Sequence, residues 1–339
     1  MKLDTQLGGT DLRRVAAEAQ RHERMGFDGT WTLENMHDPY VPLAIAAQHT
    51  TRLQIGTNIA IAFARSPFST ATTAWDLQHL SGGRFHLGLG TQVRAHVERR
   101  FSMPFEHPAA RIKDYVRCLR AIWDSFQHDA PATYEGEFYK FKLITPAFNP
   151  GPLEHPHIPV FLAGVNPTML RTAGEVADGF HLHPFHSQGY LRDVVRAHLD
   201  EGARTRGKRV EDVQISGSIF TVSGATQAET DAQLETVRAK ISFYASTPNY
   251  RAVLAYHGME ALGQELSKLA RAGAWDAMAR KIPDALLELI AVVAPPAQLA
   301  ARLKARYAGL LHRVSLYYPL SPQDPEPRWR AFVDTFQAA

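Results

Sequence analysis

The stretch that decides the fold runs from Leu53 to Gln92 and reads LQIGTNIAIAFARSPFSTATTAWDLQHLSGGRFHLGLGTQ. Its pattern predicts a strand, a long loop, an amphipathic helix and a second strand, which together make one strand–helix–strand unit of a parallel sheet. Both strands end in small or polar residues, at 56–58 and at 88–92. Because parallel α/β folds bind ligands at the carboxyl ends of their strands, we expect a functional site at these two ends.

The alternation of strands and helices extends outward from this unit in both directions. Strands are predicted at 3–7, 30–33, 54–58, 85–89, 160–162, 179–182, 213–222 and 314–318. Helices are predicted at 11–25, 42–49, 68–80, 108–126, 167–176, 190–206, 227–244, 295–307 and 329–336. This repeated unit indicates an α/β protein with a (β/α)8 TIM barrel. A doubly wound open sheet is the alternative, and the lack of a G-x-G-x-x-G sequence after a strand disfavours it.

Two insertions interrupt the alternation within what we expect to be a single domain, residues 1–339. The first covers about 133–158, where TYEGEFYKFKL (133–143) predicts a surface hairpin and a proline-rich loop follows. The second, about 247–284, is expected to be helical. The second insertion is expected to roof the pocket together with 63–67 and 93–105. The aromatic side chains in these segments suggest a partly apolar substrate: Phe63, Phe101, Phe105, Tyr250 and Tyr256.

Composition excludes several classes of function. The 339 residues carry 37 basic and 34 acidic side chains, and this balance gives no electrostatic footprint for nucleic acid. The single cysteine, Cys118, permits no disulfide within the chain and is expected to be a buried apolar residue. We see neither a secretory signal nor an apolar run of the ~18 residues that a membrane span needs. We therefore expect a cytoplasmic protein with no nucleic-acid or membrane partner.

The loop after the second predicted strand holds the first candidate residues. Glu34, Asn35 and His37 bring an acid, an amide and an imidazole to the catalytic face of a barrel. Such groups position substrates or transfer protons. The plainer interpretation is that Asp38 and Pro39 only make a turn before the next helix.

Three further strand ends offer candidate binding residues. Asn58 and Ile59 end a strand, where a bulge would let a flat ring rest on the backbone, although an ordinary buried strand fits equally well. The glycine-containing run Gly90, Thr91 and Gln92 would let a ligand approach the chain closely, or simply allow tight packing. Residues 163–166 (Ala163, Gly164, Val165 and Asn166) precede a helix that starts at Pro167, and free amides at a helix start bind phosphate.

Histidines cluster at the end of the sixth predicted strand. His181, His183 and His186 lie within six residues, and an H-x-H pair on a barrel strand is typical of metal-dependent hydrolases. The carboxylate and lysine partners of such a site are not evident at the other strand ends. We therefore predict no metal ligand and keep the metal-dependent TIM-barrel hydrolase as a lesser alternative.

Several motifs match a known family in the right order. They are Glu34-Asn35 with Asp38-Pro39-Tyr40, then IGTN (55–58), LSGGRFHLGLG (80–90), YEGEFY (134–139), PVFLAG (159–164) and LRTAGEVADG (170–179). The chain thereby resembles the bacterial luciferase-like superfamily of flavin- or deazaflavin-dependent oxidoreductases. The motifs span most of the first 180 residues, whereas the C-terminal half matches only in its order of elements.

The resemblance implies a flavin bound at the C-terminal mouth of the barrel. It also implies that the Asn58–Ile59 peptide bond is a non-proline cis bond forming a bulge behind the ring. By position, Gly90, Thr91 and Gln92 would flank the cofactor. The segment from Ala163 to Asn166 would hold its phosphate, and His183 would lie near the ring or its side chain.

Within the superfamily, the segments GTNIAIAFARSP (56–67) and GLGTQVRAHVERR (88–100) resemble those of the branch that uses coenzyme F420, a deazaflavin. The resemblance thus implies hydride transfer between F420 and a small organic substrate, in a homodimer. One position departs from the branch, because Asn35 stands where a histidine is common and cannot donate a proton. Proton donation would fall to Glu34, to His37 or to no side chain. An FMNH2-dependent two-component monooxygenase therefore remains the alternative, and a non-catalytic flavin-binding barrel is a further one.

Overall fold

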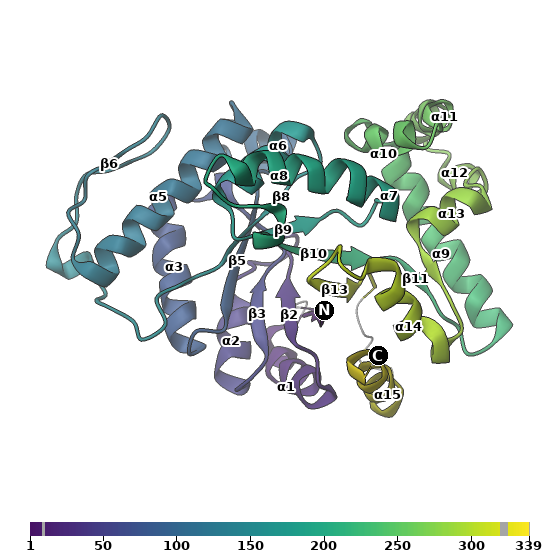
Figure 1. The fold of residues 1–339 in the computed structure, drawn as a ribbon, viewed down its shortest axis with the longest axis horizontal. Coiled ribbons are helices and arrows are strands. Elements are labelled where there is room, and N and C mark those ends of the chain that lie inside the picture. The colour runs from purple at the N-terminus through teal and green to yellow at the C-terminus, as the bar shows by residue number, and fades with distance from the viewer. Residues whose placement is uncertain (9–10, 319–324, 339) are drawn as a thin grey trace.

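The computed structural model describes residues 1–8, 11–318 and 325–338, and its centre is a closed barrel of parallel strands (Figure 1). The strands are β1 (Lys2–Gln6), β2 (Gly29–Thr32), β3 (Gln54–Thr57), β5 (Phe85–Gly90), β8 (Val160–Ala163), β9 (Gly179–Leu182), β10 (Gln214–Ile219) and β13 (Arg313–Leu316). Each pairs with the next in this order, and β13 pairs back with β1. The predicted (β/α)8 barrel is confirmed, and the open sheet is wrong.

Helices surround the barrel and follow the strands in the predicted order. They include α1 (Val15–Met25), α2 (Val41–His49), α3 (Pro67–Leu80), α5 (Pro108–His128), α6 (Pro167–Val176), α8 (Arg196–Arg204), α14 (Pro296–Tyr307) and α15 (Glu326–Ala338). Local chemistry sets their ends: Ser66 caps α3 through its side chain, and Gly26 ends α1 in the left-handed conformation. The helix predicted at 190–206 is less regular, since a short turn α7 (Gln188–Tyr190) and a π-helix (Leu191–Val195) precede α8.

The floor of the barrel is a buried ion pair that joins the first and last strands. The Arg313 guanidinium donates to both carboxylate oxygens of Asp4 at 2.7 Å and to Gln54 Oε1 at 2.6 Å. Above it, the Arg313 guanidinium lies 5.1 Å from the centre of the Trp31 ring. The Trp31 ring in turn packs edge-on against His86 and His181. The inside of the barrel is therefore filled with side chains from floor to mouth.

Both predicted insertions contain the expected kinds of element. The first holds the antiparallel hairpin β6 (Tyr134–Glu135) and β7 (Lys140–Phe141), which projects from one side of the molecule in Figure 1. The second follows α9 (Gln227–Ser246) and contains α10 (Arg251–Tyr256), α11 (Glu260–Arg271), α12 (Trp275–Arg280) and the start of α13 (Asp284–Ile290). These helices gather around α9, on the opposite side from the hairpin (Figure 1).

Two features differ from the sequence prediction. The strand predicted at 213–222 is two strands, β10 and then β11 (Thr221–Val222), and β11 leaves the barrel to pair with β12 (Val292–Val293). A short helix α4 (Arg94–Arg100) was not predicted, because Val97 is its one buried residue and no apolar stripe marks it. No helix in the described ranges is long and apolar enough to cross a membrane.

Candidate functional site at the mouth of the barrel

A bulge stands at the carboxyl end of β3, at the candidate residues Asn58 and Ile59. The Asn58–Ile59 peptide bond is cis, as the resemblance implies. Before it, Gly56 pairs with His86 of β5; after it, Ala60 of the short strand β4 (Ala60–Ile61) pairs with Leu89. Three residues on one strand thus face two on the other. The predicted bulge is confirmed, and the ordinary continuous strand is wrong.

The hydroxyl of Thr57 repairs the hydrogen bonding across this bulge. It donates to the Gly88 carbonyl oxygen at 2.6 Å and accepts from the Gly88 N–H at 2.9 Å. Gly88 must lack a side chain, since a Cβ there would lie 1.9 Å from the Thr57 carbonyl oxygen. One side chain therefore replaces the missing main-chain partners on both sides of the bulge.

Glu34 holds the bulge from the neighbouring loop. Its N–H donates to the Ile59 carbonyl at 3.2 Å, and its carboxylate accepts from the Ile61 N–H at 2.6 Å. The Arg65 guanidinium donates to the same carboxylate at 2.9 Å and to Asp38 at 2.8 Å. Burial alone would lower the pKa of Arg65, but the Glu34 carboxylate raises it above its usual value.

The other two candidates in this loop have different surroundings. Asn35 and His37 are exposed, and the Asn35 side-chain oxygen accepts from the Met36 N–H at 2.5 Å. Asp38 accepts from the Tyr40 N–H at 2.8 Å, so the turn expected before the next helix is also present. Arg65 escaped the sequence analysis, because nothing in its local sequence marks it as the partner of a carboxylate 31 residues away.

The candidate run from Gly90 to Gln92 lies directly against this bulge. A Cβ on Gly90 would come within 2.8 Å of the Ile59 side chain, so the two segments touch at this glycine. Gln92 has a left-handed backbone with φ of 56°, an uncommon conformation for a residue with a side chain. Its side-chain oxygen accepts from the Val93 N–H at 3.0 Å, and the Thr91 hydroxyl donates to the Gln92 carbonyl at 3.2 Å.

The third predicted segment turns from β8 into α6. The Asn166 side chain accepts from the Met169 N–H at 2.8 Å and so caps the helix that begins at Pro167. Gly164 is required by packing, since a Cβ would lie 2.1 Å from Met169. Local structure thus accounts for both residues. Because Pro167 has no N–H and the cap holds the Met169 N–H, an anion at this end of α6 would depend on the Thr168 N–H.

His183 shares a small cavity of about 20 Å³ with Gly164 and Val165. The His183 ring stacks on Tyr250 from the second insertion, with centres 4.1 Å apart, and meets Tyr244 edge-on at 4.7 Å. Burial, with a smaller contribution from His186, lowers the pKa of His183 to about 3. Its Nδ1 accepts from the Phe185 N–H at 3.1 Å, so the neutral ring carries its proton on Nε2.

The histidines of the H-x-H pair do not converge on one point. His181 lies inside the barrel, 3% exposed, and stacks on Phe161 at 4.9 Å, whereas His183 faces the Tyr250 ring. Within residues 1–8, 11–318 and 325–338, no three His, Cys, Asp or Glu side chains gather in a way that could hold a metal ion.

Comparison with known proteins gives this arrangement a family. Residues 2–313 match the family model described as luciferase-like monooxygenase. The chain belongs to the luciferase-like monooxygenase family. This luciferase-like protein is 44% identical over 324 residues to an uncharacterized protein of Mycobacterium tuberculosis (strain H37Rv), covering 96% of this chain and 95% of the relative.

Two further comparisons involve coenzyme F420 by name. A second M. tuberculosis protein is 32% identical over 313 residues, covering 86% of this chain and 88% of the relative. Its name assigns it provisionally to the coenzyme F420-dependent oxidoreductases. The solved structure of coenzyme F420-dependent tetrahydromethanopterin reductase from Methanopyrus kandleri has a TM-score of 0.80 at 18% identity, covering 99% of this chain and 98% of that chain. At that identity, the likeness bears on the fold alone. Together with the family, these relatives support oxidoreductase or monooxygenase activity for this luciferase-like protein.

Proposed function

We propose that this protein is a coenzyme F420-dependent oxidoreductase that transfers a hydride between the deazaflavin and a small, partly apolar organic substrate. The observation that carries the proposal is the bulged strand end at Asn58–Ile59, packed against Gly90 at the barrel mouth. The relative at 32% identity named for F420 favours the deazaflavin over other flavins.

The residues at the mouth fit a flavin-type group. The bulge and Gly90 offer main chain for a flat ring, and the neutral His183 with Tyr250 offers aromatic faces. Burial and the neighbouring Tyr244 raise the pKa of Tyr250 to about 12, so it is also uncharged at neutral pH. The segment from Ala163 to Asn166 would hold the phosphate together with the Thr168 N–H at the start of α6. When bound, F420 supplies the hydride chemistry, and the protein supplies orientation and a dry pocket.

Glu34 acts in this proposal as a positioning residue. Its carboxylate is 7% exposed and already accepts from Ile61 and Arg65, so it holds the backbone behind the ring. Donors from the backbone and from a guanidinium thus occupy this carboxylate, which suits a positioning role. His37 and Asn35 stand at the exposed edge, and His37 is the side chain in this loop that can bring a proton from solvent.

The experiment that tests the proposal is a titration of the purified protein with F420 and, separately, with FMN, following fluorescence quenching. We expect saturable micromolar binding of F420. Micromolar binding of FMN with no response to F420 would contradict the deazaflavin assignment.

An FMNH2-dependent two-component monooxygenase is the second candidate, because the matching family model describes monooxygenases. Reduced FMN would then support oxygen consumption, which a deazaflavin does not normally support. Measuring oxygen uptake with reduced FMN, with and without the protein, separates the two candidates.

We also propose a homodimer that forms through α2 and the loop before it. This helix has apolar residues all round (VPLAIAA, 41–47), and Leu33, Met36 and Val41 are 45%, 74% and 46% exposed. Exposed apolar patches of this kind mark interfaces. Sedimentation of the wild type and of Met36→Glu tests it: a dimer that becomes a monomer supports the interface, and a wild-type monomer contradicts it.

A further inference from the structure

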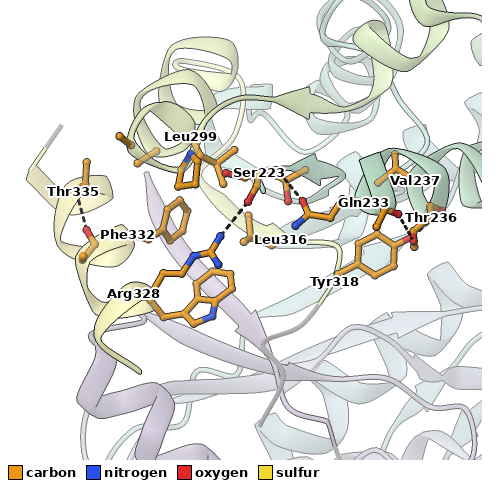
Figure 2. Close-up of a pocket in the computed structure, with 17 residues that line it drawn as sticks. Ser223, Gln233, Thr236, Val237, Leu299, Leu316, Tyr318, Arg328, Phe332 and Thr335 are labelled. Carbon is orange, nitrogen blue, oxygen red and sulfur yellow. Dashed lines mark hydrogen bonds between the residues drawn. The ribbon is translucent and has the colours of Figure 1, made fainter. Parts of the chain in front are cut away.

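A cavity of about 560 Å³ lies outside the barrel, between α9, α14 and α15 (Figure 2). The end of β13 and the chain after β11 complete its wall. Its volume falls within the range of pockets that bind small molecules. None of the residues that we assign to the flavin site lines it, so it needs an explanation of its own.

Most of the cavity wall is apolar. Val237, Leu299 and Leu316 form its inner surface, and the first two are at most 5% exposed. Trp329 and Phe332 of α15 face them and pack edge-on against each other at 5.7 Å. This part of the wall is suited to a hydrocarbon or aryl group.

One corner of the cavity is polar and rich in donors. The Arg328 guanidinium donates to the Ser223 carbonyl at 3.1 Å, and Gln233 reaches the same residue from the other side, its Oε1 accepting from the Ser223 N–H at 2.6 Å (Figure 2). Gln233 therefore presents its NH2 group as a donor. The Ser223 hydroxyl is buried and, among the described residues, has no hydrogen-bond partner.

Positive charge dominates this corner. Among the described lining residues, Arg328 is the one charged side chain, with no Asp or Glu. Its guanidinium has no carboxylate partner within the part of the chain that the structure describes, and the bond to Ser223 uses one of its five N–H donors. A planar guanidinium beside a hydroxyl and an amide matches the geometry of a carboxylate.

We propose that this cavity binds a small organic carboxylate with an apolar body. The carboxylate lies at the corner formed by Arg328, Ser223 and Gln233, and the body lies between Leu299, Phe332 and Trp329. This site is separate from the flavin site and does not rest on the proposed function.

The test uses octanoate and its uncharged analogue octanol, each titrated into the protein by isothermal calorimetry. We expect octanoate to bind with one site per chain and at least about tenfold more tightly than octanol, because charge-assisted hydrogen bonds to the corner are lost in the alcohol. Arg328→Met should bind the two probes equally. Arg330→Met, on an exposed position of the same helix, is the matched control and should behave like the wild type.

A second variant keeps the proposal testable if Arg328→Met does not fold. Ala297 lines the cavity from an exposed position on α14, and Ala297→Phe should fill the space and abolish binding of both probes without disturbing the core. Three results would overturn the proposal. They are equal affinity of the wild type for octanoate and octanol, unchanged octanoate binding in Ala297→Phe, and no octanoate binding by folded wild type at millimolar concentration.

Discussion

Two carboxylate–arginine pairs stand at opposite ends of the barrel and do different work. The floor pair, Asp4 with Arg313, has side chains 0% and 1% exposed and joins β1 to β13. The rim pair, Glu34 with Arg65, has side chains 7% and 23% exposed and joins two loops. The same carboxylate–guanidinium pairing thus occurs once in the dry interior of the barrel and once at its partly hydrated rim.

The difference lies in what each pair holds. The floor pair links two strands whose backbones the sheet already fixes, so its removal leaves a buried charge in an otherwise intact ladder. The rim pair holds backbone beside the bulge, where the pairing with β5 is interrupted, since the Glu34 carboxylate also accepts from the Ile61 N–H. We infer that the floor pair governs stability, while the rim pair governs the shape of the ligand site.

Breaking the floor pair should have the largest effect. Asp4→Ala leaves the Arg313 guanidinium buried without a counter-charge and should lower the free energy of unfolding by about 3–5 kcal/mol. Urea unfolding at neutral pH measures this loss. The double variant Asp4→Ala with Arg313→Met should recover a large part of it. A single variant as stable as the wild type would show that the floor pair is dispensable.

Acid should destabilise the layer between the two pairs. Burial, with a smaller contribution from Arg313, lowers the pKa of His86 and of His181 to about 3. The unfolded chain protonates these rings near pH 6.5, whereas the folded chain does not. Stability is therefore full above pH 6.5 and falls as the pH drops from 6.5 towards 3, by about 1.4 kcal/mol per pH unit for each ring.

Urea unfolding at pH 7.5 and pH 5.5 measures this dependence. The two rings together should cost about 3 kcal/mol between these values. His181→Gln removes one titrating group and should reduce the pH-dependent loss by roughly half of that amount. Equal unfolding free energies at the two pH values would contradict neutral buried rings.

Removing the hydroxyl at the bulge tests whether the rim needs its own support. Thr57→Val keeps the shape of the side chain but leaves the buried N–H and C=O of Gly88 without partners, and should cost about 2–3 kcal/mol of stability. Thr57→Ser keeps the hydroxyl and is the matched control. Thermal unfolding of both variants makes the comparison, and equal losses would mean that the hydroxyl contributes nothing.

Weakening the rim pair should have the smallest effect on stability and a distinct effect on binding. Glu34→Gln keeps an acceptor for the Ile61 N–H but loses the charge that faces Arg65. We expect F420 affinity to fall about tenfold, which corresponds to about 1.4 kcal/mol. Unfolding free energy should change by less than about 1 kcal/mol. Asp38→Asn, which removes only the outer bond to Arg65, should have a weaker effect on affinity.

The pH profile of turnover separates positioning from proton donation at Glu34. If Glu34 only positions the bulge, Glu34→Gln keeps the shape of the wild-type profile at a lower rate. Loss of one limb of the profile in this variant would make Glu34 the proton donor instead.

The sequence predicts the barrel well, because its strands and helices have patterns that are set locally. The strand at 179–182 and the helix at 167–176 stand at their predicted places. The strand at 213–222 was predicted as one, since nothing local shows that β11 leaves the barrel for β12, some 70 residues later. Short elements such as α4 have too few buried residues to give a period.

The candidate site was predictable in its location but less so in its chemistry. Parallel strand ends locate 58–59, 90–92 and 163–166 without any contact being known. The role of Glu34 depends on Arg65, and the floor pair joins residues 309 positions apart, so neither is visible in a single sequence. Tyr250 was foreseen as part of an aromatic roof, but its stacking on His183 depends on how the insertion folds back.

The one-residue mismatch between β3 and β5 fixes the length of the loop at residues 57–59. Deleting one residue there would let the two strands pair without interruption from the Ile55–Phe85 pair to the Ile61–Gly90 pair. The ladder would then be continuous. Ala60 and Ile61 would stay opposite Leu89 and Gly90, because the mismatch lies within residues 57–59. The bulge itself would be lost, and with it the displaced main chain at Asn58 and Ile59 on which the proposed ring would rest. For an engineer reshaping this pocket, the number of residues at the bulge is therefore the feature to keep.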